Sequence, residues 1–228
     1  MSPIDQTTPK IIIKGKDKKK SKQTFNWLRI MIHVIGILPL LELAYKTYAN
    51  QLTVNPIQFV EQFFGRAALN ILVVSLAVTP FITITGGKKP ARHSRALGLY
   101  AFLYFLLHFL TFAVVDYGLD FREIFRLTTE KPFIIVGSLA GFLLLLLAIT
   151  SFKFWKKLLG KNWKRLHRSV YLVSVLVILH YAWAVKGSIS TLSGDIGRPI
   201  LMGSIVFLLL ILRIPPIKQW IINRRMRR

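Results

Sequence analysis

The chain has 228 residues, of which 53% are hydrophobic, yet it carries a formal net charge of +23. Long apolar blocks alternate with short basic ones, a pattern that excludes a soluble domain with a single core and argues against a nucleic acid partner. The sequence contains no cysteine, which excludes disulfides and every cofactor held through a thiolate.

The apolar blocks predict an all-α integral membrane protein, a bundle of six transmembrane helices, because each crossing needs roughly 20 apolar residues in helical form. Residues 1–25 should form a disordered, lysine-rich tail on the lipid headgroups, residues 26–213 the six-helix domain, and residues 214–228 a second basic tail. The six spans are expected at residues 27–45, 66–84, 98–115, 132–151, 168–185 and 199–212. Residues 55–64 mix large apolar and polar side chains, which predicts a short separate amphipathic helix at the interface.

The basic residues predict the orientation of the bundle. With six spans, 25 of the 32 lysines and arginines fall on one side of the membrane and 7 on the other. By the positive-inside rule, both termini are then cytoplasmic. The loops on the opposite side are then the protein surface that faces away from the cytoplasm.

Two of the five histidines lie deep within predicted spans. His108 lies about 15 Å and His180 about 18 Å from the cytoplasmic ends of their helices, at roughly 1.5 Å per residue. Two imidazoles at one depth on separate helices can bind haem iron from both faces. The alternative is two buried histidines bonded to carbonyl or hydroxyl groups, but the matched depth and a third histidine at the helix mouth favour non-covalently held haem b.

The third histidine, His167, raises the question of a second haem. It precedes His180 by 13 residues, so two haems on this helix would lie roughly 20 Å apart. On a straight helix the two side chains would point about 140° apart, and only a distortion or side-chain reach at the helix end would align them. His93 or Arg95 could complete the inner site, or both could simply bind headgroups. His33 could line a quinone or flavin pocket or serve only in packing.

Other classes of function receive less support from the sequence. No glycine-rich dinucleotide loop is present, so the chain should not bind NAD(P)H by itself. A transporter or channel would need acidic partners within the spans, where Glu42 is a poor one, and we find no internal repeat. A cofactor-free scaffold stays open.

Several motifs occur in a specific order over about residues 26–187. They are Asn55-Pro56, Gly65-Arg66-Ala67-Ala68-Leu69, Leu76-Ala77-Val78-Thr79-Pro80, Leu97 to Phe102 ending at His108, Lys131-Pro132-Phe133, Ile149-Thr150-Ser151, Gly160 to Arg168 with Tyr171, and His180 to Lys186. In these motifs the chain resembles the MsrQ (formerly YedZ) family of the ferric-reductase-like transmembrane superfamily. Two departures are a phenylalanine at Phe133, where tyrosine is expected, and a longer basic N-terminal tail.

The resemblance implies a haem b subunit of the bacterial inner membrane that supports the repair of oxidised proteins. Its electrons would pass to a periplasmic, molybdopterin-containing methionine sulfoxide reductase. The donor would be the quinone pool or a cytosolic flavin reductase, and FMN is also associated with the family. The family's haem histidines correspond to His108, His167 and His180.

Overall fold

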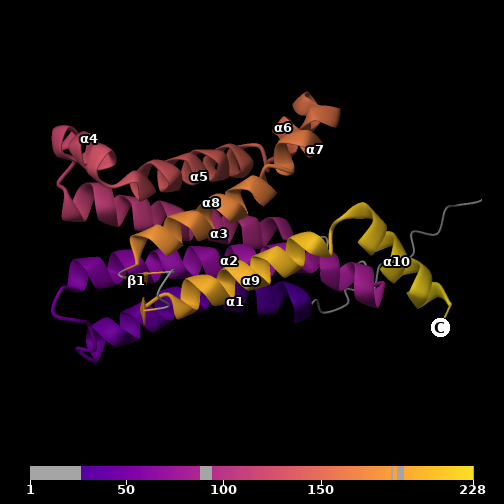
Figure 1. The fold of residues 1–228 in the computed structure, drawn as a ribbon, viewed down its shortest axis with the longest axis horizontal. Helices are drawn as coiled ribbons and strands as arrows, with labels where there is room; N and C mark the ends of the chain where they lie inside the picture. The colour runs from indigo at the N-terminus through magenta and orange to yellow at the C-terminus, as the bar shows by residue number, and fades with distance from the viewer. Residues whose placement is uncertain (1–26, 88–93, 186, 189–192, 228) are drawn as a thin grey trace, which may run out of the picture.

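The computed structural model describes residues 27–87, 94–185, 187–188 and 193–227 as a bundle of helices that run along one axis (Figure 1). Within these ranges, five helices are long and apolar enough to cross a membrane, and a bent pair makes up to six. The predicted all-α membrane architecture is confirmed. The N-terminal basic tail lies outside the described residues.

The first two long helices are α1 (Trp27–Tyr48) and α2 (Pro56–Thr85). The predicted separate amphipathic helix at residues 55–64 is wrong, because these residues are the first turns of the continuous, 30-residue α2. The side chain of Asn55 accepts a hydrogen bond from the Gln58 amide, and Pro56 suits the first turn, so the helix starts there. At about 45 Å, α2 exceeds the roughly 30 Å hydrocarbon core, so part of it extends beyond that core.

The middle of the chain forms α3 (Ser94–Leu110), a π-helical turn η2 (Thr111–Asp116), α4 (Phe121–Glu130) and α5 (Pro132–Ile149). Sequence analysis predicted only a loop where α4 lies. Asp120 caps this helix by accepting from two backbone amides, and Arg126 pairs with Glu123 and Glu130 along its exposed face.

In the last third of the chain, one long helix, α8 (Val170–Ala184), lies between two helix pairs. The pair before it is α6 (Lys153–Leu159) and α7 (Lys161–His167), and the pair after it is α9 (Gly197–Ile211) and α10 (Pro215–Met226). Between α8 and α9, strand β1 (Gly187–Ser188) pairs with β2 (Ser193–Gly194). Helix α10 occupies most of the region predicted as a basic tail. It is bent by 71° from α9, and only together do the two pass as a span.

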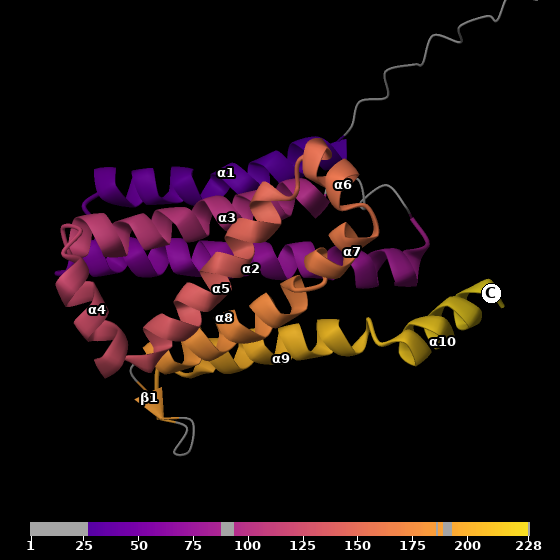
Figure 2. The same ribbon diagram turned by 90° about the horizontal axis from the view of Figure 1, so that it is seen from above.

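The short elements gather at the two ends of the bundle (Figure 2). Helix α4 and the β1–β2 hairpin lie at one end, whereas α6, α7 and α10 lie at the other. Helix α1 begins at the same end at which α10 finishes, as expected for an even number of crossings. The assignment of that end to the cytoplasm stays a prediction from the charges.

The long helices pack as two pairs. Helix α2 packs mainly against α3, and α5 mainly against α8, with smaller contacts of α3 with α5 and of α2 with α8. Leu97, Ala101 and Tyr104 lie on one face of α3 and are almost fully buried. At Gly141 a side chain would overlap the ring of Phe105, so this glycine lets α5 approach α3.

An arginine joins the end of α9 to the rest of the bundle. Pro80 has no N–H, so the carbonyl of Leu76 in α2 lacks its normal helical partner. Arg213 donates one guanidinium hydrogen bond to this carbonyl at 2.6 Å and another to the hydroxyl of Tyr171 on α8 at 2.8 Å. The proline in α2 thereby creates an acceptor that fixes the C-terminal part of the chain.

Candidate functional site

His108 lies on α3 and faces the neighbouring helix α2. Its Nδ1 is 2.9 Å from the backbone carbonyl of Glu61. A carbonyl only accepts, so Nδ1 carries the proton and donates, which leaves Nε2 with a free lone pair. Gly65 eases this close approach, since a Cβ there would lie 3.3 Å from His108 Nδ1 and the ring would have to shift by a few tenths of an ångström.

His180 on α8 repeats this arrangement against α5. Its Nδ1 donates to the backbone carbonyl of Phe133 at 2.8 Å. A Cβ at Gly137 would lie 2.6 Å from His180 Nδ1. In both helix pairs the glycine lies four residues after the residue whose carbonyl accepts the hydrogen bond, and the histidine lies 47 residues after that same residue. The structure thus shows a short internal repeat that sequence analysis missed.

The two histidines meet between the two helix pairs. Their ring centroids lie 6.2 Å apart, with the ring planes at 76°. Each bond from a first-row metal to an imidazole nitrogen is about 2 Å. A ring nitrogen lies about 1.1 Å from its ring centre when the ring bonds are about 1.33 Å. A single metal between two Nε2 atoms therefore needs the centroids about 6 Å apart, which the pair matches.

The surroundings of the pair suit haem better than a bare ion. Haem iron takes four nitrogens from its macrocycle and needs only two axial ligands from the protein. No group of three or more candidate ligand side chains was found within the described residues. Backbone carbonyls that hold the distal nitrogens are the usual outer partners of metal-bound histidines, because they fix the tautomer and the ring orientation.

The phenylalanine at Phe133 does not disturb this arrangement. His180 is held by the main-chain carbonyl of Phe133, and the two rings lie edge to face with centroids 5.8 Å apart. A tyrosine at this position would offer the same carbonyl. The departure from the expected residue therefore leaves the ligand geometry intact.

His167 lies at the opposite end of α8, in a different setting. Its Nε2 is 3.2 Å from Thr150 Oγ1, and its ring stacks on Trp163 with centroids 4.0 Å apart. The helix is interrupted here, because α7 ends at His167 and α8 begins only at Val170. The structure does not bring a second imidazole to His167 within the ranges it describes.

Of the two residues predicted to complete the inner site with His167, the structure describes only Arg95. His93 lies outside the described residues. Arg95 is exposed and its guanidinium lies 5.6 Å from the ring centre of Phe152. The composition of an inner site stays a prediction.

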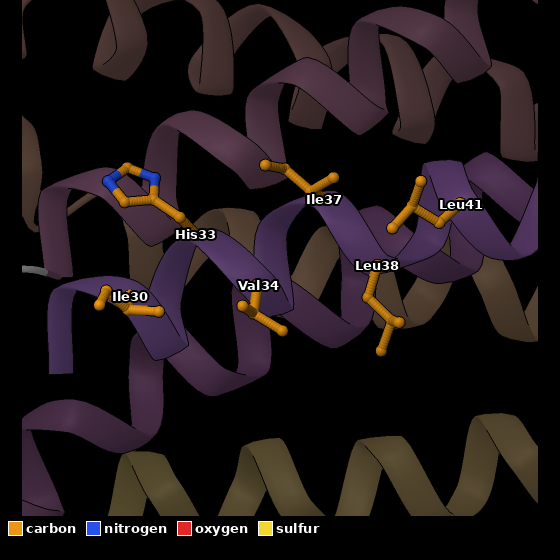
Figure 3. Close-up of a pocket in the computed structure, with 6 residues that line it drawn as sticks. All are labelled: Ile30, His33, Val34, Ile37, Leu38 and Leu41. Atoms are coloured by element: carbon orange, nitrogen blue, oxygen red, sulfur yellow. The ribbon is translucent and has the colours of Figure 1, made fainter. Parts of the chain in front are cut away.

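His33 has the packing role expected of it, and its role in a quinone or flavin pocket stays a prediction. Its Nδ1 shares a 2.9 Å hydrogen bond with the hydroxyl of Tyr100, so it is a satisfied packing histidine. It also borders an open groove of about 270 Å³ along α1 (Figure 3). The other residues that line this groove are apolar: Ile30, Val34, Ile37, Leu38 and Leu41.

Sequence comparisons identify the family of the chain. The profile described as "Ferric reductase like transmembrane component" matches residues 62–178. The chain is 35% identical to the protein-methionine-sulfoxide reductase heme-binding subunit MsrQ of Pectobacterium atrosepticum over 87% of this chain and 96% of that protein. The chain belongs to the MsrQ family of ferric-reductase-like membrane proteins.

Two further MsrQ proteins match over similar lengths. That of Herminiimonas arsenicoxydans is 39% identical over 82% of this chain and 84% of its own length. That of Bordetella pertussis is 37% identical over 80% and 86%. Together with the apolar helices, membership of the MsrQ family identifies the chain as a multi-pass protein of the bacterial inner membrane.

Proposed function

We propose that this chain is the membrane electron-transfer subunit of a methionine sulfoxide reductase system, and that His108 and His180 hold a haem b within it. The observation that carries the proposal is the pair itself. Two imidazoles with centroids 6.2 Å apart both have Nδ1 engaged by a carbonyl, so both Nε2 atoms are free to bind iron. The MsrQ relatives, named as heme-binding subunits, support the same cofactor.

The protein's own contribution is to hold the ligands in place before the cofactor binds. Bound haem would supply a one-electron iron couple within the bilayer. The carbonyls of Glu61 and Phe133 set the tautomer and direction of the two histidines, and the glycines Gly65 and Gly137 make room for the rings. The half-buried setting between helix pairs keeps the site low in dielectric.

The direction of electron flow follows from the predicted topology. The acceptor would be a periplasmic, molybdopterin-containing methionine sulfoxide reductase that docks at the end formed by the α1–α2 loop, α4 and the β1–β2 hairpin. The donor would be the quinone pool or a cytosolic flavin reductase, with FMN as a further cofactor. His167, at the opposite end of α8, would serve a second, inner haem.

The experiment is an absorption spectrum and a haem count on purified protein. The wild type should show a reduced b-type α band, and acid acetone should extract the haem because no cysteine tethers it. His108→Ala and His180→Ala should each abolish the α band of the haem that the two histidines hold together. His167→Ala should lower the haem content and leave that band unchanged.

The matched control is His33→Ala, which removes a membrane histidine with a known partner at a distance from the pair. It should retain haem. Full haem retention in His108→Ala would remove the basis of the proposal, and complete loss in all four variants would attribute the effect to folding instead of ligation. A wild type without haem would favour a cofactor-free scaffold.

A further inference from the structure

Arg66 is a cation of α2 beside the histidine pair. It follows Gly65, the residue that contacts the ring of His108, and it lies ten residues into α2. Its side chain is only partly exposed. Partial burial of a charged group is costly unless the group has a partner, so the partners of this guanidinium bear on the site.

The guanidinium of Arg66 lies within electrostatic range of groups from three other helices. They are Tyr181, which directly follows His180 on α8, Arg198 on α9 with Asp195 just before that helix, and Glu42 on α1. The contacts of α2 with α8 and α9 place these elements side by side. Tyr181 is thus next to one histidine in sequence, and Arg66 is next to Gly65, the residue packed against the other.

Within the described residues, neither Arg66 nor Arg198 forms an ion pair at contact distance. The ion pairs found there join Lys46 to Glu42, and Arg126 to Glu123 and Glu130. The side-chain hydrogen bond found for Arg66 goes to the oxygen of Gln62, at the limiting distance of 3.5 Å. Asp195 and Glu42 attract Arg66 only from beyond ion-pairing distance, whereas Arg198 repels it, so a closer anion would be favourable.

We propose that Arg66, assisted by Arg198 and the hydroxyl of Tyr181, binds a propionate carboxylate of the haem held by His108 and His180. The inference rests on the proposed function, since it assigns further residues to the same cofactor. Haem carries two carboxylates at one edge, and a planar guanidinium matches a carboxylate through two parallel hydrogen bonds. Arg66 directly follows the residue packed against His108, so a carboxylate at the edge of a haem bound there would lie close to its guanidinium.

The test compares haem with haem dimethyl ester, in which both carboxylates are blocked. The full-length apoprotein, in detergent, is titrated with each compound, and the dissociation rate of each is measured by transfer to a haem scavenger. Wild type should release haem at least about tenfold more slowly than the ester, the scale expected for an outer partner of a bound metal group. Arg66→Gln should release the two compounds at equal rates.

Two further variants separate charge from structure. Arg66→Lys should lower the midpoint potential less than Arg66→Gln does, because a nearby cation stabilises the form with the extra electron, and should regain only part of the discrimination against the ester. Arg198→Gln, like Arg66→Gln, should reduce the difference between the release rates of haem and its dimethyl ester. Arg122→Gln, an exposed arginine on α4, is the control and should match wild type.

The outcomes are distinguishable. Unchanged discrimination and midpoint potential in Arg66→Gln would overturn the inference and leave the haem proposal standing. Equal binding of haem and its ester by wild type would also overturn it. Absence of haem binding by wild type would instead refute the proposed function.

Discussion

Replacement of Gly137 by alanine tests the closeness of His180 to α5. The added Cβ would lie 2.6 Å from His180 Nδ1 and 2.8 Å from Cε1. Non-bonded carbon contacts are comfortable at about 3.5 Å, so the imidazole must retreat by about 1 Å. The 2.8 Å hydrogen bond to the Phe133 carbonyl would then exceed hydrogen-bonding distance.

The expected result is a large loss of haem affinity without loss of fold. Removal of an outer hydrogen bond to a metal ligand costs about 10- to 100-fold in affinity, which is about 1.4 to 2.7 kcal/mol. Alanine is a better helix former than glycine by about 1 kcal/mol, so the substitution should not weaken α5 itself. The measurement is haem per protein by pyridine haemochrome, followed by a haem titration of the apoprotein.

Two glycines of other helices provide the comparison. Gly65→Ala places its Cβ 3.3 Å from His108 Nδ1, so a shift of a few tenths of an ångström suffices and affinity should fall by less than about tenfold. Gly98→Ala on α3 meets nothing within 4 Å and should bind haem like wild type. Full haem content and an unchanged titration in Gly137→Ala would refute the argument that Gly137 positions the ligand.

Three further outcomes are expected. Arg213→Gln should destabilise the detergent-solubilised protein by about 1 to 3 kcal/mol and lower its melting temperature, because it leaves a buried carbonyl of α2 unpaired. Arg224→Gln, on the exposed side of α10, should leave the melting temperature unchanged. In intact cells, Gln51→Cys should react with a membrane-impermeant maleimide and Lys157→Cys should not; the reverse pattern would invert the predicted topology. Pure, flavin-free protein should not oxidise NADH unless a flavoprotein is added, and direct reduction of its haem by NADH would contradict this expectation.

The membrane helices and the approach of the two deep histidines could be predicted, because both depend on the hydrophobicity of the side chains along each helix. Residues of a bilayer helix must be apolar for about 20 positions, and a histidine among them is conspicuous. The boundaries were harder. The polar residues Gln58, Glu61 and Gln62 suggested an interfacial helix, whereas the Asn55 cap and Pro56 start α2 and it continues unbroken. Helix α4 is short and polar, but Asp120 at its N-cap and the spacing of Glu123, Arg126 and Glu130 were signals of a helix that the search for long apolar spans did not use.

The groups that orient the histidines could not be found from residue types. Both acceptors are backbone carbonyls, which every residue possesses, so the side chains of Glu61 and Phe133 do not indicate their role. The one available signal was the recurrence of a glycine at the same interval before each deep histidine. Depth alone also did not show that α3 packs on α2 and α8 on α5, which decides the direction of each ring.

The division of the bundle into two helix pairs gives the cofactor a thermodynamic role. One pair supplies His108 and the other His180, so a ligand bound to both histidines bridges two units that otherwise share few contacts. Such a ligand binds only the assembled chain and stabilises it by about 2.7 kcal/mol at a free concentration of 100 times its Kd. We expect the haem-free chain to open first at the interface between the two helix pairs and then to be degraded by membrane proteases. Haem supply would then set how many copies persist in the membrane.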